Sequence, residues 1–160
     1  MKCCDILCIY TKERMKMKFK QINKSKCHCI TMRRATNAVT EYYDGALREL
    51  DLTTSQYSLL KNLYRLKTAS TSELAEYVNL DRSTLVRNLK PLQERGLIAD
   101  LAKENARNHK FTLTDAGFAL LEEANPRWEQ VQVEMKAYLG EENVELFMEM
   151  LYKLQELSLE

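Results

Sequence analysis

The sequence predicts a mainly α-helical fold with a single β-hairpin, and three observations lead to this prediction. Only four glycines and two prolines occur among the 160 residues, which leaves few positions for strands and tight turns. Side chains that can cap a helix stand before most of the apolar runs with helical spacing. Residues 97–114 alone combine two short β-prone segments, "LIADLA" and "HKFTLT", around the charged linker "KENARN".

The first 26 residues differ from the rest, because they are basic and lack a clean apolar period. We expect a flexible basic N-terminal extension here, since chain ends are ordered only where other contacts hold them. A translation start placed too early would look the same, with the natural start at Met15, Met17 or Met32.

Residues 27–50 predict the first long helix. Their apolar side chains recur at steps of three and four positions, as on one face of a helix. These residues are Ile30, Ala35, Ala38, Val39, Tyr42, Ala46, Leu47 and Leu50.

Two capping boxes predict the starts of the next two helices. Thr53 is followed three positions later by Gln56, and Ser70 by Glu73 in the same way. The first helix carries an apolar stripe of Leu59, Leu60, Leu63 and Leu66, and the second is short, ending near Val78.

The segment "DRSTLVRNLKPLQERG" predicts a fourth helix with two different faces. Asp81 can cap it, and Gly96 can end it by adopting a left-handed conformation. Leu85, Leu89 and Leu92 share one face, which we expect to be buried.

After the hairpin, Thr114 can cap a long helix with an apolar period through Leu139, and Gly140 separates it from a last helix. The last helix carries a stripe of Val144, Phe147, Met148, Leu151, Leu154 and Leu157. This stripe is more apolar surface than a small lobe can cover, so it requires a partner.

The order helix, short helix, turn, helix and hairpin predicts a winged helix-turn-helix with a two-stranded β wing. In that motif the second helix of the pair enters the major groove of DNA. Ser83, Thr84, Arg87 and Asn88 lie on one side of the expected recognition helix. Arginine can bind guanine and asparagine can bind adenine, whereas serine and threonine more often bind phosphates.

The expected tip of the hairpin is also basic. It carries Lys103, Arg107, His109 and Lys110. A basic wing can enter the minor groove, where narrow A·T tracts concentrate negative potential. The alternative is a solvated loop without a partner.

The charge distribution favours an anionic partner for the middle of the chain. Residues 61–112 hold 10 basic and six acidic side chains, whereas residues 113–160 hold three basic and 11 acidic ones. We therefore expect double-stranded DNA to meet the middle third, with the acidic third turned away. The basic residues 1–26 could then form an arm on the phosphates.

These segments resemble the MarR family of bacterial and archaeal transcriptional regulators. The resemblance rests on "LTTSQYSLLKNLYRL", "STSELAEYVNLDRSTLVRNLKPLQERGLI" and "ARNHKFTLTDAG", in this order. It implies a homodimer that binds palindromic operators, generally as a repressor that a small ligand or an oxidant releases. The resemblance places the recognition contacts on Arg82, Ser83, Thr84, Arg87 and Asn88, and the wing arginine on Arg107.

One position departs from the family pattern. The wing usually reads Asp, any residue, Arg, whereas this chain has Asn105, Ala106 and Arg107. An amide can hydrogen-bond the arginine without charge assistance, so the support for Arg107 should be weaker.

The expected domain organisation follows from the same resemblance. After the extension of residues 1–26, residues 27–50 form an N-terminal dimerisation helix. Residues 51–113 form the winged DNA-binding lobe, and residues 114–160 form C-terminal dimerisation helices. The N- and C-terminal helices together make a helical dimerisation body.

The cysteines allow three interpretations. All five lie within the first 29 residues, which is not a disulfide framework. Cys27 and Cys29 precede the first helix beside basic residues, a setting that favours a redox-reactive thiol. Burial or inert exposure is the second interpretation, and metal binding is the third, although a closed zinc site needs four ligands.

An effector pocket is expected between the dimer body and the DNA lobe, where Arg34, Tyr42, Tyr43, Tyr64 and Trp128 could line it. Aromatic residues at helical spacing are more often core residues, so none of these marks a site alone.

Other function classes are less compatible with the sequence. A winged-helix protein-interaction module would not need a basic middle. An enzyme is not expected, because a C-x-x-C motif, a glycine-rich phosphate loop and a coherent acid–base cluster are all missing from the sequence. We expect no cofactor and no metal, and a cytoplasmic protein, because the apolar runs are too short for a membrane span.

Overall fold

The computed structural model describes residues 24–102 and 109–157. The chain divides into two units between Val39 and Thr40, a point that lies inside α2 (His28–Leu47). In the first unit, α2 exposes every residue from Thr31 to Val39. Among the described residues, no helix is both long and apolar enough to span a membrane.

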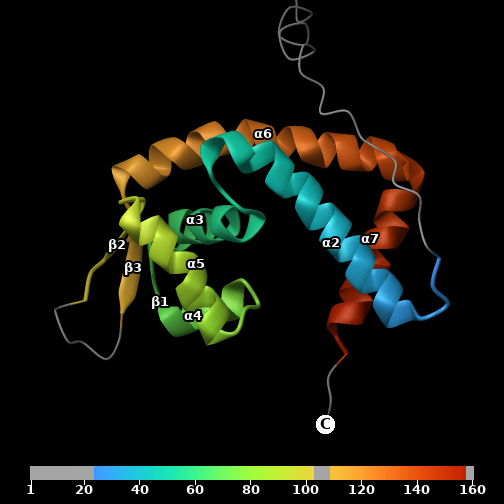
Figure 1. The fold of residues 1–160 in the computed structure, drawn as a ribbon, viewed down its shortest axis with the longest axis horizontal. Helices are drawn as coiled ribbons and strands as arrows, with labels where there is room; N and C mark the ends of the chain where they lie inside the picture. Colours follow the sequence, from blue (N-terminus) through green and yellow to red (C-terminus); the bar gives the residue numbers. More distant parts are fainter. Residues whose placement is uncertain (1–23, 103–108, 158–160) are drawn as a thin grey trace, which may run out of the picture. The chain divides into compact units, whose positions relative to one another are not determined.

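Helices make up most of the described chain, with three short strands among them (Figure 1). The elements after α2 are η1 (Arg48–Leu50), α3 (Thr54–Leu66), β1 (Thr68–Ser70), α4 (Thr71–Tyr77), α5 (Arg82–Glu94), β2 (Ile98–Asp100), β3 (Lys110–Leu113), α6 (Asp115–Leu139) and α7 (Glu141–Gln155). The mainly α-helical winged architecture is therefore confirmed.

Both predicted capping boxes are present. The Thr53 hydroxyl accepts from the Gln56 amide at 3.2 Å, while the Gln56 side chain accepts from the Thr53 amide at 2.9 Å. Ser70 and Glu73 make the same reciprocal pair at 3.2 and 2.7 Å. These bonds satisfy amides that the first turn of a helix otherwise leaves unpaired.

The sheet has one strand more than the sequence predicts. The expected antiparallel hairpin of β2 and β3 is confirmed, but β1 also pairs with β3, so the order is β1-β3-β2. The three residues of β1, "TAS", lack the β-branched and aromatic run that marks a strand in a sequence. Tertiary pairing creates this strand, with Ala69 opposite Phe111.

A leucine-rich core fixes the lobe. The stripes predicted on α3 and α5 point inward, and the fully buried large side chains are Leu47, Leu59, Leu60, Leu63, Leu74, Leu85, Leu89, Leu92, Leu121 and Val131. In contrast, α7 has no buried residue. Its apolar stripe remains open to solvent in a single copy.

The end of α5 is built as predicted around Gly96, which has a φ of +68°. The Gly96 amide donates to the Gln93 carbonyl at 2.9 Å, and the Leu97 amide donates to the Leu92 carbonyl at 2.9 Å. These two bonds form a Schellman motif, which glycine favours because it adopts left-handed backbone angles without steric cost. The chain then turns directly into β2.

Candidate nucleic-acid interface

The predicted recognition helix α5 is anchored on one side only. Leu85, Leu89 and Leu92 are almost fully buried in the core. The side opposite these leucines is exposed to solvent. A helix held in this way presents a fixed row of side chains to a partner.

Asp81 organises the N-terminus of this helix. Its carboxylate accepts from the Thr84 amide at 2.9 Å and from the Ser83 hydroxyl. Hydrogen bonds from Ser83, and then from Thr84, hold the pKa of Asp81 well below its usual range. Asp81 is therefore ionised at neutral pH, where its charge also complements the helix dipole.

Arg82 and Arg87 are the available cations of α5. Both side chains are exposed. Within residues 24–102 and 109–157, neither guanidinium has a hydrogen bond or an ion pair. Lys90 differs, because it forms an ion pair with Glu94 at 3.8 Å. The two arginines are thus free to bind phosphates or base edges.

Asn88 is placed differently from Arg87. Its side chain is half-buried, and its Nδ2 donates to the Thr84 carbonyl at 2.9 Å. Thr84 is half-buried as well. The structure thus brings Arg82, Ser83 and Arg87 to the open face and leaves Thr84 and Asn88 at its border.

The wing is described only at its base. Two predicted contacts, Lys103 and Arg107, lie outside the described residues, as does the neighbouring Asn105. Lys110 begins β3, and its side chain is exposed. Its position at the foot of the hairpin is compatible with the predicted contact.

Asp100 holds this base together, and sequence reasoning missed it. Its carboxylate accepts from the Ala102 amide at 2.9 Å, from the Lys110 amide at 3.3 Å and from the His109 ring. Burial alone would raise the pKa of Asp100, but these hydrogen bonds outweigh it and lower the pKa overall. The sequence signal that could have indicated this role is the position of Asp100 at the end of a short β-prone run.

Cys27 and Cys29 are both free and exposed in the single copy, which leaves redox reactivity or inert exposure as the interpretations of these two thiols. The Cys27 carbonyl accepts from the amide and hydroxyl of Thr31 at 3.0 and 2.9 Å, and Cys29 lies in the first turn of α2. Within the described parts of the chain, no group of three or more His, Cys, Asp or Glu side chains could hold a metal ion.

Two of the residues expected to line an effector pocket, Tyr43 and Trp128, are in contact with other aromatic rings. Trp128 stacks on Tyr57, with ring centroids 4.4 Å apart, and lies 4.5 Å from Tyr43. Burial is the main cause that raises the pKa of Tyr57 to about 12, and the charge of Glu129 adds to it. These aromatic rings are part of the interior.

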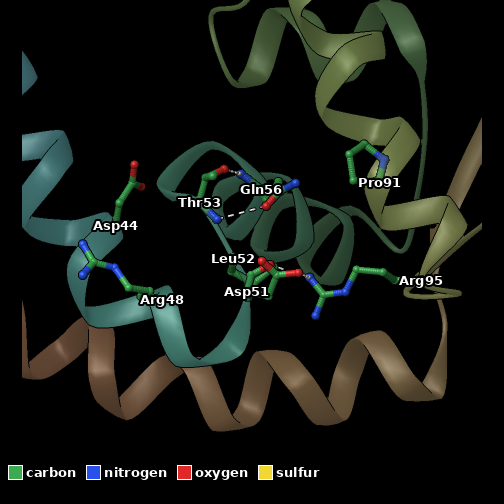
Figure 2. Close-up of a pocket in the computed structure, with 8 residues that line it drawn as sticks. All are labelled: Asp44, Arg48, Asp51, Leu52, Thr53, Gln56, Pro91 and Arg95. Carbon is green, nitrogen blue, oxygen red and sulfur yellow. Dashed lines mark hydrogen bonds and ion pairs between the residues drawn. The ribbon is translucent and has the colours of Figure 1, made fainter.

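A shallow cavity of about 370 Å³ lies elsewhere, between η1, the start of α3 and the end of α5 (Figure 2). Arg95 closes one side of it and donates to the Leu50 carbonyl at 3.0 Å and the Asp51 carbonyl at 2.5 Å. Asp44 accepts from the amide and hydroxyl of Thr54, both at 2.6 Å. The polar groups of the cavity are thus largely engaged with one another.

Comparison with protein families gives one match for the winged lobe. Residues 52–109 match the model of the MarR family. This segment begins just before α3 and ends at the foot of β3. It therefore contains the capped helices α3 and α4, the helix α5 and the strand β2, and it ends before β3.

Individual proteins are similar over more of the chain. The organic hydroperoxide resistance transcriptional regulator of Bacillus subtilis is 29% identical over 111 residues, which cover 69% of this chain and 76% of that protein. The crystal structure of the M. tuberculosis transcriptional regulator MosR in complex with DNA is 33% identical, with a TM-score of 0.65, over 82% of this chain and 100% of that one. The transcriptional repressor CouR, bound to a 23-mer DNA duplex, is 25% identical with a TM-score of 0.73, over 87% of this chain and 99% of that one.

Proposed function

The chain belongs to the MarR family of winged-helix transcriptional regulators, and on this basis we propose that it is a homodimeric repressor of palindromic operators. Its relatives are transcriptional regulators rather than enzymes. In this proposal α3 to β3 form the DNA-binding lobe, and α2, η1, α6 and α7 form the dimerisation body. Two lobes related by a twofold axis would read half-sites about 34–36 Å apart.

One observation carries the DNA-binding proposal: Arg82 and Arg87 project from a helix whose other side is packed in the core, and neither has a partner among the described residues. Free guanidinium groups can bind guanine through O6 and N7, or bind phosphates. Ser83 lies between them, and its acceptor lone pairs remain available while its hydroxyl donates to Asp81. Lys103, Arg107 and Lys110 would add wing contacts.

The test is a mobility-shift titration with DNA from upstream of the chain's own gene, against random duplex of equal length, over a salt series. Specific binding should weaken steeply as salt rises, because phosphate contacts release counterions. Arg87→Ala should lose about 1–3 kcal/mol of binding free energy. Lys61→Ala, which removes the same charge from α3, is the matched control and should bind normally. Equal affinity of Arg87→Ala and the unmodified protein would exclude Arg87 from the interface.

The dimer proposal rests on apolar side chains that a single copy leaves exposed. On α6 and α7 these are Val133, Tyr138, Leu146, Phe147, Met148, Met150, Tyr152 and Leu154. So many exposed large apolar side chains on two helices favour an interaction with a partner. A second copy of the chain covers it in the proposed assembly.

Sedimentation equilibrium tests the dimer directly. The unmodified protein should sediment as a dimer at micromolar concentration, and Phe147→Glu should shift it toward the monomer, because a charge on the apolar face opposes burial. Glu145→Lys, an exposed charge change on the same helix, is the control. A monomeric unmodified protein would contradict the proposal.

For release from DNA, the structure offers exposed thiols more directly than a ligand pocket. We therefore extend the proposal to thiol oxidation at Cys27 and Cys29. A hydroperoxide would transfer its terminal oxygen to a thiolate, which gives a sulfenic acid and leaves the corresponding alcohol. The similar protein of Bacillus subtilis is an organic hydroperoxide resistance regulator, which supports this class of oxidant.

The redox step is tested by DNA affinity before and after cumene hydroperoxide. The unmodified protein should lose affinity, and dithiothreitol should restore it. Cys27→Ser and Cys29→Ser, made singly and together, identify the reacting thiol. Unchanged affinity of the oxidised unmodified protein would exclude thiol sensing and leave a small ligand as the releasing signal.

A further inference from the structure

Val86 is an exposed apolar side chain on the DNA-facing side of α5. Its side chain is 51% exposed, although the helix buries its leucines almost completely. Val86 lies four positions after Arg82 and directly before Arg87, so it stands within the row of free cations. The core does not use it, and the described contacts of α5 give it no packing role.

The polar side chains near Val86 are poorly placed to read an A·T pair. Asn88 donates its amide to the Thr84 carbonyl, and the Ser83 hydroxyl donates to Asp81. Arginine favours guanine. Within α5, an apolar side chain is therefore a further candidate for reading A·T in the major groove.

The thymine C5-methyl is the apolar group on the base edges of the major groove, and small apolar side chains recognise it by contact. A valine in the row of DNA-facing side chains has the size and chemistry for this contact. Arg82 and Arg87 on either side would hold the helix close to the bases and phosphates.

We propose that Val86 is a specificity-determining residue that reads a thymine through its C5-methyl, beside the guanine that an arginine of α5 binds. This inference rests on the proposed DNA-binding function. It predicts that each half-site contains a thymine next to a guanine or separated from it by one base pair. It also requires that the methyl group, rather than thymine O4, carries the preference.

Deoxyuridine provides the test, because it differs from thymidine only by the absence of this methyl group. Bound duplexes are first selected from a randomised library with the full-length protein. Each thymine of a selected duplex is then replaced singly by deoxyuridine, and affinities are measured by fluorescence anisotropy. One symmetry-related pair of thymines should respond, with a loss of about fourfold per half-site, as expected for one buried methyl group.

The variant Val86→Ala should bind the selected duplex more weakly and become insensitive to deoxyuridine at that position. Alanine favours helix and the site is exposed, so the variant should fold normally. Lys61→Ala, at an exposed side chain of α3 outside both the proposed DNA contacts and the proposed dimer face, is the control and should keep the deoxyuridine response. The same position filled with cytosine should recover affinity when 5-methylcytosine replaces it.

Three outcomes separate this inference from the function on which it rests. Selected DNA that binds equally well with every deoxyuridine would overturn the methyl contact alone. An unchanged deoxyuridine response in Val86→Ala would assign the methyl contact to another residue. A library that yields no enriched sequence would overturn both the DNA-binding proposal and the inference.

Discussion

The hydroxyl of Thr114 donates to the carbonyl of Gly96 at 2.7 Å, which ties the start of α6 to the end of α5. The same oxygen accepts from the Gly117 amide at 3.0 Å, and the Thr114 amide donates to the Leu97 carbonyl at 3.1 Å. Thr114 therefore caps one helix and fixes the end of another. The recognition helix is held at its C-terminus by this residue and at its N-terminus by Asp81.

We expect Thr114→Val to lower the free energy of unfolding by about 1–2 kcal/mol, because it removes an N-cap and a cross-link between helices. Urea denaturation followed by circular dichroism measures this change. Thr114→Ser keeps the hydroxyl and should stay close to the unmodified protein. An unchanged free energy of unfolding in Thr114→Val would contradict a stabilising role of these hydrogen bonds.

Gly117→Ala should destabilise the protein by about 1–3 kcal/mol through overpacking. A Cβ at this position would lie 2.0 Å from the Leu97 carbonyl oxygen, which is backbone and cannot move aside alone. Helix propensity by itself predicts the opposite sign, since alanine favours helix over glycine. Thermal denaturation decides between the two, and a raised melting temperature would contradict the close approach.

The stability that Asp81 provides should depend on pH. Folding lowers the pKa of Asp81 from its ordinary value of 3.8. The stability that the ionised carboxylate provides is therefore present above about pH 4, and it is lost as the pH falls toward the folded-state pKa. Asp81→Asn keeps a capping oxygen without the charge. The stability difference between the two proteins should therefore hold from pH 7 to pH 5 and shrink below pH 4. A difference that is constant down to pH 3 would exclude an ionic contribution.

The stability that Tyr57 provides should depend on pH in the opposite direction, with a loss at alkaline pH. Its pKa is raised from 10.0 to about 12, so its stabilising effect is present below pH 10 and is lost as pH rises from 10 to 12. Absorbance at the tyrosinate band should reveal a late-titrating group that is missing in Tyr57→Phe. Tyr64→Phe, at an exposed tyrosine, provides the control. Identical titration curves for the two variants would contradict the burial of the Tyr57 hydroxyl.

Local signals account for the part of the fold that could be predicted from the sequence. Capping by Thr53, Ser70 and Asp81 depends on residues three positions away, and the leucine stripes repeat within single helices. β1 could not be predicted, because its partner is far away in sequence and its own composition is neutral.

In the candidate site, too, some features could be predicted from the sequence and others could not. The exposed Arg82 and Arg87 follow directly from helical spacing. The turn of Asn88 toward the backbone depends on a hydrogen bond that composition does not show. Asp100 was missed because its partners lie on both sides of the hairpin and meet only when the strands pair.

The central position of β3 also bears on how the lobe folds. β1 and β3 are joined by contacts between residues far apart in the sequence, such as the hydrogen bond from Thr112 to the Lys67 carbonyl, 45 positions away. The helices α4 and α5 both lie in the loop that these contacts close. Closing such a long loop is entropically unfavourable until the intervening helices are packed. We therefore expect the amides of β1, α4, α5 and β2 to become protected from hydrogen exchange together, so that a nascent chain lacking β3 has no completed DNA-reading surface.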